Sequence, residues 1–178
     1  MLTLKVHLKT MNINIKNNFM EKFQITANGY EKLKKQLDNL KNIERPNIIK
    51  QIATARELGD LRENAEYHSA KERQGFIEAQ IADLEDKFLR SQVVDIAKIV
   101  SDKIQFGAKV TIKNIDNSKI IIYKIVSEFE ANIDENLISI NSPVARALLG
   151  KEVGEEIEIK TPGGEFAFEV LKIVFEND

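Results

Sequence analysis

Residues 59–68, GDLRENAEYH, mark the point at which the first half of this chain turns back on itself. Gly59 is typical of the end of a helix, and Asp60 followed three residues later by Glu63 is the pattern of a capping box that opens the next helix. The same two carboxylates lie one helical turn apart, a spacing that can also hold a divalent cation. The residues alone leave both interpretations open, capping and metal chemistry.

The residues before this turn predict an amphipathic helix that begins after Thr26, a suitable N-cap. Its apolar residues recur at spacings of three and four and form a stripe along one face. Pro46 interrupts the pattern and removes a backbone donor, so we expect a kink there, or two helices that meet there. The predicted stripe consists of Leu33, Leu37, Leu40, Ile48, Ile52 and Ala55.

The residues after the turn predict a second amphipathic helix. Because the connection is short, this helix has to fold back antiparallel along the first, which hides both apolar stripes in a shared seam. We therefore expect a long helical hairpin that projects from the rest of the protein, with its tip near residues 59–63. The stripe predicted for the second helix consists of Leu61, Ala65, Phe76, Ala79, Leu84 and Phe88.

From about residue 99 the sequence changes to β-branched runs that predict strands at residues 110–115, 119–129 and 137–140. Ser142 and Pro143 predict the start of a short helix that Gly150 closes. The alternation around PGG predicts a terminal β-hairpin. The predicted fold class is α+β, with a coiled-coil hairpin domain at residues 20–98 and a small α+β domain at residues 99–178.

The composition excludes several kinds of site. With no cysteine in the chain there is no disulfide, no thiolate zinc site and no cysteine nucleophile, which suits a reducing cytoplasm. No apolar run is long enough to cross a bilayer, so we expect no membrane association. The formal net charge of −2 provides no basic field that would grip RNA or DNA unaided, so any such contact has to be local.

Basic and aromatic side chains near the predicted tip form a second candidate site. Arg56, Lys71 and Arg73 could steer a phosphodiester backbone toward the acids, although a solvated charged face is the more common explanation. Tyr67 could stack on a base or pack across the hairpin, and His68 is expected to be a surface residue. The chain has no phosphate-binding loop, nucleophile elbow or H-E-x-x-H helix, which makes a self-sufficient enzyme the weaker class.

The segment GDLRENAEYHSAKERQGF resembles the transcript cleavage factors of bacterial transcription elongation, the GreA/GreB family. The resemblance extends through residues 45–88 and 141–173 and covers essentially residues 20–178. Proteins of the family begin near the equivalent of Met20, so residues 1–19 are expected to be a disordered N-terminal extension. We interpret this extension as a translated leader in preference to a basic arm, and it lacks the apolar core of an export signal.

The resemblance implies that the hairpin enters the secondary channel of bacterial RNA polymerase, while an FKBP-like domain at residues 99–178 docks at the outer rim. Asp60 and Glu63 match the tip acids of the family, which help to hold a Mg²⁺ ion jointly with the polymerase's own aspartates and help to position the attacking water. A half-site completed by a partner fits two-metal hydrolysis. On this interpretation the two acids cap the helix and also take part in catalysis. They hold the metal ion only in the complex with the polymerase.

Other residues match further parts of the family pattern. Arg56 and Lys71 would lie near the 3′ end of a backtracked RNA, with Arg73 and Tyr67 as further candidate RNA contacts. Lys71 stands where the family commonly has arginine, which keeps the charge but loses bidentate phosphate contact. This modest basic patch is more similar to that of GreA than to that of GreB, so we expect a preference for short backtracks.

Ser142 and Pro143 match the loop that resembles the polymerase-docking surface of the family. We therefore predict a monomeric, cytoplasmic accessory factor that activates RNA cleavage by the polymerase and is not itself an enzyme. The alternatives are a relative that occupies the same channel but inhibits, a coiled-coil chaperone or adaptor, and an independent prolyl isomerase. The tip acids argue against the inhibitor, and an FKBP-like shape does not by itself imply isomerase activity.

Overall fold

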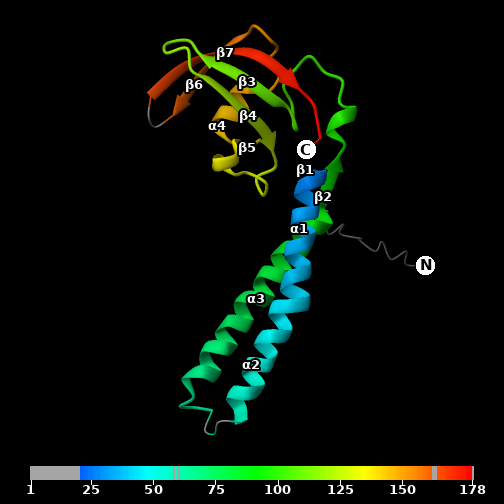
Figure 1. Ribbon diagram of the computed structural model, residues 1–178, viewed down its shortest axis with the longest axis vertical. Coiled ribbons are helices and arrows are strands. Elements are labelled where there is room, and N and C mark those ends of the chain that lie inside the picture. The colour runs from blue at the N-terminus through cyan, green and yellow to red at the C-terminus, as the bar shows by residue number, and fades with distance from the viewer. Residues whose placement is uncertain (1–20, 58, 60, 162–163, 178) are drawn as a thin grey trace, which may run out of the picture.

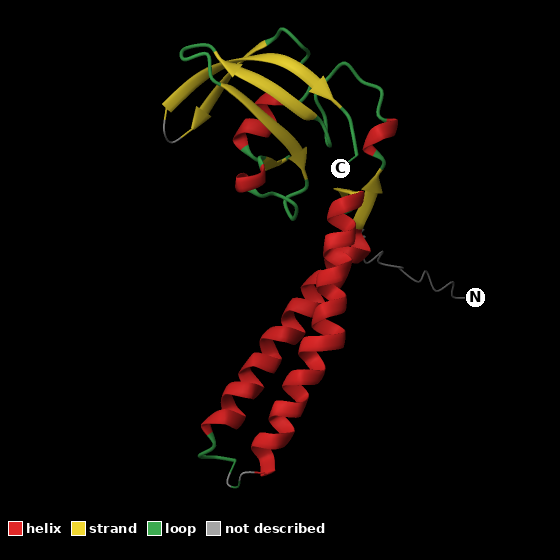
Figure 2. Ribbon diagram, viewed as in Figure 1, coloured by secondary structure: helices red, strands yellow, loops and turns green. Residues whose placement is uncertain are grey.

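The computed structural model describes residues 21–57, 59, 61–161 and 164–177. A long helical hairpin and a curled β-sheet domain follow one another along the longest axis of the molecule (Figure 1; Figure 2). The predicted extension at residues 1–19 and the tip acid Asp60 lie outside the described residues. Within the part that is described, no helix combines the length and apolar character needed to span a membrane.

The base of the hairpin is closed by a two-stranded parallel sheet that the sequence did not predict. Strand β1 (Phe23–Thr26) precedes the first helix, and strand β2 (Ser91–Val94) follows the last. Helix α1 (Ala27–Asn39) begins directly after β1, and the Gly29 N–H donates to the Thr26 hydroxyl oxygen at 3.0 Å. The prediction that Thr26 caps this helix is confirmed.

A π-helical turn, η1 (Leu40–Glu44), joins α1 to α2 (Arg45–Glu57), and the two helices continue as one arm of the hairpin (Figure 1). The Arg45 N–H donates to the Leu40 carbonyl oxygen, five residues earlier. Pro46 follows at once, and because it has no N–H the regular hydrogen-bond ladder cannot pass through it unchanged. The predicted discontinuity at Pro46 is confirmed and takes the form of this turn.

The second arm, α3 (Ala65–Arg90), buries a different face from the one predicted. Its core residues are Ala70, Ile77 and Ile81, whereas Phe76 is 64% exposed. Successive residues point about 100° apart around a helix, so Phe76 and Ile77 cannot both face the first arm. Ile77 lies in line with Ala70 and Ile81 at spacings of seven and four, and it therefore takes the buried position.

The predicted stripe of the first arm is buried throughout, as expected: Leu33, Leu37, Leu40, Ile48, Ile52 and Ala55. The predicted stripe of α3 is wrong at four of its six positions, since Leu61, Ala65, Phe76 and Ala79 are exposed and only Leu84 and Phe88 are half-buried. Ion pairs add to the seam. The Arg45 guanidinium donates to the Glu78 carboxylate across it and holds the pKa of Glu78 below its ordinary value.

The second half of the chain forms a five-stranded sheet made of β3 (Lys109–Asn114), β4 (Ile120–Val126), β5 (Leu137–Ser139), β6 (Glu156–Thr161) and β7 (Gly164–Val174). The strands lie in the order β5-β4-β3-β7-β6, with β5 parallel to β4 and the other neighbours antiparallel. The helix α4 (Pro143–Leu148) packs into the sheet's core, where Ile112, Ile125, Leu148 and Val170 are fully buried. The predicted terminal hairpin is present as β6 paired with β7. The α+β fold class is confirmed.

Two short 3₁₀ helices, η2 (Ile96–Lys98) and η3 (Ile133–Glu135), lie in the connections.

Candidate functional site at the hairpin tip

The tip of the hairpin is the turn between α2 and α3, at the end farthest from the sheet domain (Figure 1). Helix α2 ends at Glu57, and Gly59 adopts a φ of 118°, a conformation that favours glycine. A Cβ atom added at Gly59 would meet nothing within 4 Å, so the backbone conformation and not space requires glycine there. The prediction that Gly59 ends the first arm is confirmed.

Asn64, and not the predicted Asp60, caps the second arm. Its side-chain oxygen Oδ1 accepts from the Tyr67 N–H at 3.0 Å, and its Nδ2 donates to the Ala55 carbonyl oxygen at 2.8 Å. Because α3 begins at Ala65, Glu63 lies before the cap and cannot close a capping box. The capping role predicted for the tip acids is therefore wrong. Asparagine is as good a cap as aspartate, and its amide also ties the turn to the first arm.

Glu63 is exposed in the turn formed by residues 61–63. Its carboxylate is the kind of hard oxygen ligand that Mg²⁺ prefers. Among the described residues, no group of three or more histidines, cysteines, aspartates or glutamates is placed to hold a metal ion. Glu63, together with Asp60 three residues earlier in the sequence, fits Mg²⁺ in chemical type, but the two carboxylates supply only part of a coordination shell.

Arg56 and Tyr67 lie together beside the tip. The Arg56 guanidinium carbon is 5.8 Å from the centroid of the Tyr67 ring, and this ring packs half-buried against the core of the hairpin. The structure thus shows Tyr67 packing across the hairpin, and its base-stacking role stays a prediction. The exposed His68 ring makes an edge contact with Tyr67, and its Nε2 lies 3.1 Å from the Arg62 carbonyl oxygen. His68 is a surface residue, as predicted.

The other two predicted basic residues lie farther along α3. Lys71 is exposed, and its Nζ donates to Gln74 Oε1 at 2.8 Å. Arg73 approaches Glu44 in the π turn, with 3.5 Å between Nη2 and the carboxylate oxygen. Glu44 precedes the whole of α2, so this contact draws Arg73 toward the middle of the hairpin, away from Arg56. The RNA-binding roles of all three cations stay predictions.

The other candidate surface lies at the start of α4. Ser142 caps this helix, since its hydroxyl oxygen accepts from the Ala145 N–H at 3.1 Å. Pro143 is exposed at the first helical position, and Gly150 follows the helix with a φ of 81°. The predicted helix start and end are confirmed, whereas a docking role for Ser142 and Pro143 stays a prediction.

Replacing Asn64 with alanine is expected to destabilise the hairpin by about 1 kcal/mol, because the Tyr67 N–H loses its acceptor. Chemical denaturation followed by circular dichroism at 222 nm measures this loss. Asn64→Asp is the matched control, since it keeps the cap acceptor but removes the donor to the Ala55 carbonyl oxygen. A variant Asn64→Ala as stable as the wild type would contradict the assignment of the cap.

Two family models match nearly the whole described chain. The model described as "Transcription elongation factor, N-terminal" matches residues 23–93, and "Transcription elongation factor, GreA/GreB, C-term" matches residues 99–175. A transcription elongation factor GreA from Caulobacter sp. (strain K31) is 51% identical over 86% of this chain and 98% of its own length. GreA from Pasteurella multocida (strain Pm70) is 49% identical over 88% of this chain and its own full length.

Solved structures of similar proteins include GreA factor homolog 1 (Gfh1) of Thermus thermophilus. It is 28% identical and covers 86% of this chain and 99% of its own, with a TM-score of 0.41. The elongation factor GreA/GreB from Nitrosomonas europaea is 21% identical and covers 86% of this chain and all of its own, with a TM-score of 0.39.

Proposed function

We propose that this chain, which belongs to the GreA/GreB family of transcription elongation factors, works by entering the secondary channel of bacterial RNA polymerase and stimulating cleavage of backtracked RNA. The observation that carries the proposal is the exposed Glu63 carboxylate at the end of a long, narrow arm, in a turn whose helix is capped by another residue. An acid that no helix needs as a cap is available to a partner. The polymerase performs the chemistry, and this chain is its accessory factor in the cytoplasm.

The length of the arm suits delivery of a side chain to a distant site. The 26 residues of α3 extend for about 39 Å at about 1.5 Å per residue, with a continuous buried seam against the first arm. Such an arm is stiff enough to hold its tip in one place once its base is anchored. The hairpin is therefore the positioning element, and the tip carries the chemistry.

In the complex, Asp60 and Glu63 would hold Mg²⁺ together with carboxylates of the polymerase. When bound, this ion supplies charge stabilisation and a water of lowered pKa. The chain's own contribution is to bring two anionic groups to the reacting phosphodiester and to orient the attacking water by accepting its hydrogen bond. Arg56 and Lys71 would hold the phosphates of the displaced 3′ end, with Arg73 and Tyr67 as outlying contacts.

The proposal is tested with stalled, backtracked elongation complexes whose RNA is labelled at either end. Adding this protein is expected to release short 3′ fragments at a rate well above that of the polymerase alone. Efficient release of long fragments would contradict the preference for short backtracks that the modest basic patch supports. Binding to the polymerase without any cleavage would instead favour an inhibitor of the same channel.

Substituting Pro143 with glutamate is expected to weaken binding to the polymerase about tenfold, because a charged side chain would replace an exposed apolar ring on the proposed docking surface. Glutamate also suits the first turn of a helix, so the start of α4 should survive. A competition assay against labelled wild-type protein measures the affinity. Val153→Glu, at an exposed apolar residue after α4, is the control, and equal affinities for both variants would contradict the docking role.

A further inference from the structure

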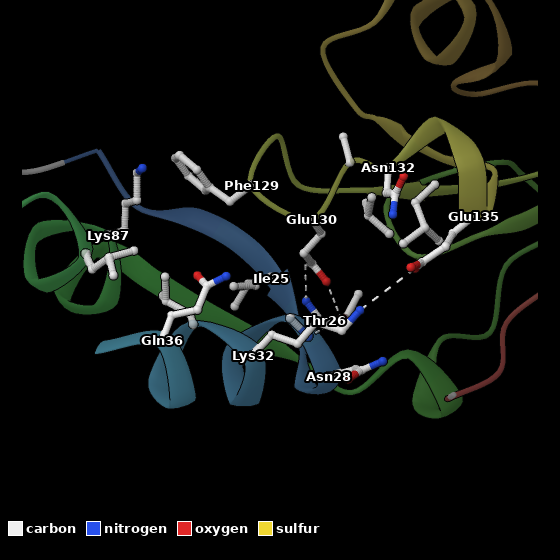
Figure 3. A pocket seen from close by; sticks show the side chains of 16 residues that line it. Ile25, Thr26, Asn28, Lys32, Gln36, Lys87, Phe129, Glu130, Asn132 and Glu135 are labelled. Carbon is white, nitrogen blue, oxygen red and sulfur yellow. Dashed lines mark hydrogen bonds and ion pairs between the residues drawn. The ribbon is translucent and has the colours of Figure 1, made fainter. Parts of the chain in front are cut away.

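The loop between β4 and β5 reaches across to the base of the hairpin, and Glu130 makes the central contact (Figure 3). Its carboxylate accepts a hydrogen bond from the Thr26 hydroxyl and another from the Thr26 N–H at 3.3 Å. From its own side it accepts from the Ser127 hydroxyl at 2.6 Å and from the Ser127 N–H at 3.3 Å. One carboxylate thus joins the first turn of α1 to the sheet domain.

The surroundings make these hydrogen bonds stronger than ordinary surface contacts. Thr26 is 4% exposed and Ser127 is 3% exposed, so both hydroxyls are shielded from water. Hydrogen bonds to an ionised group are roughly twice as strong as neutral ones, and the N-terminus of α1 favours a negative charge. If the carboxylate left, the buried hydroxyl groups of Thr26 and Ser127 would lose the acceptor to which they donate.

Gly29 lets the carboxylate approach this closely. A Cβ atom built at Gly29 would lie 2.2 Å from the carboxyl carbon of Glu130, far inside van der Waals contact. Any larger residue at this helical position would push the Glu130 side chain away. The first turn of α1 is therefore shaped to receive a residue from the other domain.

Neighbouring residues of the same loop also contact the hairpin. The rings of Phe129 and Phe23 are 4.8 Å apart, and Lys87 Nζ lies 4.6 Å from the centre of the Phe129 ring. Lys32 and Glu135 form a longer ion pair at 3.9 Å (Figure 3). These contacts surround Glu130 and restrict the direction in which the hairpin leaves the sheet domain.

Among the described residues, no continuous apolar core joins the hairpin to the sheet domain. The core of the hairpin and the core of the sheet domain are separate clusters. Between the domains, beside Glu130, lies a cavity of about 350 Å³ lined by residues of both. Domains without a large apolar interface are expected to move relative to one another unless a specific contact holds them.

We propose that Glu130 is a positioning residue, which latches the sheet domain to the first turn of α1 and thereby sets the direction of the hairpin. A factor that docks through one domain and acts through the far end of the other needs this direction fixed before it binds. The molecule enters the polymerase in this latched orientation. This part of the inference rests on the proposed function. Loss of the latch leaves the tip chemistry intact but lowers the population of competent molecules.

The orientation can be measured without the polymerase. The chain has no cysteine, so Lys50→Cys on the hairpin and Asp116→Cys on the sheet domain, both exposed, can carry a pair of spin labels. Double electron–electron resonance on the otherwise wild-type protein is expected to give one narrow distance distribution. Glu130→Ala is expected to broaden this distribution, whereas Glu128→Gln, on the same loop but exposed, should not change it.

Gly29→Ala provides an independent perturbation from the helix side, because the added methyl group displaces the Glu130 carboxylate while alanine favours the helix. It should broaden the distribution as Glu130→Ala does, and it decides the question if Glu130→Ala proves unstable by circular dichroism. A distribution that stays as narrow as that of the wild type in the stable variant would overturn the proposal.

Cleavage titrations separate positioning from chemistry. Glu130→Ala is expected to raise the protein concentration needed for half-maximal stimulation about threefold to tenfold, with the maximal cleavage rate unchanged. A lower half-maximal concentration would mean that the latched form is not the binding form and would overturn that part of the proposal. If the wild-type protein stimulates no cleavage, the proposed function fails, but the distance measurement still decides whether Glu130 is a latch.

Discussion

Replacing both tip acids, Asp60→Asn with Glu63→Gln, is expected to reduce stimulated RNA cleavage by about a hundredfold or more while polymerase binding stays near the wild-type level. The amides keep the size of the acids and much of their hydrogen-bonding capacity, but they cannot supply anionic ligands or accept a proton from water. Cleavage is measured on backtracked complexes at matched occupancy, with affinity determined in parallel.

Because Asn64 is the cap of α3, this experiment can separate the catalytic role of Glu63 from a role in helix stability. Because Glu63 does not cap α3, its substitution should leave the helix content and the thermal midpoint unchanged. The variant Glu57→Gln with Glu66→Gln removes the same charge from exposed positions on either side of the tip and serves as the control. Retained cleavage in the tip variant, or equal loss in the control, would rule out a specific role for the two acids.

The second large effect is expected in the seam of the hairpin. Ile77→Ala removes a residue that is 3% exposed and should lower the stability of the hairpin by about 2–4 kcal/mol, the usual cost of a core truncation of this kind. Thermal unfolding followed at 222 nm should show a midpoint lowered by roughly 5–15 °C. The adjacent Phe76→Ala, at a position 64% exposed, is expected to change stability by less than about 0.5 kcal/mol.

This pair of variants tests the rotation of α3 directly. The two residues are neighbours on one helix, so a difference in their effects reports which face meets the first arm. If Phe76→Ala were the more damaging substitution, the helix would be rotated by about 100° from the orientation described. Helix propensity cannot produce the expected difference, because isoleucine and phenylalanine have similar helix propensities and both are replaced by alanine in the middle of the same helix.

Local patterns predicted much of this protein. The spacing of apolar residues identified both arms and the buried stripe of the first, and the turn signals at Gly59, Ser142 and Gly150 marked ends of helices correctly. Pro46 predicted the break in the first arm, because proline has no backbone N–H to donate wherever it stands in a helix. Alternation around PGG was likewise enough to predict the terminal hairpin.

The predictions were wrong where two nearby residues were equally suited to the same role by their local sequence. Asp60 and Asn64 are both strong caps, and only the contact of the Asn64 amide with Ala55 on the other arm favours the second. Phe76 and Ile77 are both apolar, and only the stripe on the first arm selects Ile77. Strands β1 and β2 are too short to predict singly, and they exist because the hairpin brings its two ends together.

The sequence by itself determined the fold class, the helical hairpin, the acidic tip motif and the family, because each depends on residues close together in the chain or on a long matched pattern. Only the tertiary structure decided which face of α3 is buried, which residue caps it, and how Glu130 meets Thr26 across more than a hundred residues. Such contacts depend on which surfaces fit once the helices and strands have packed, and no local pattern encodes that fit.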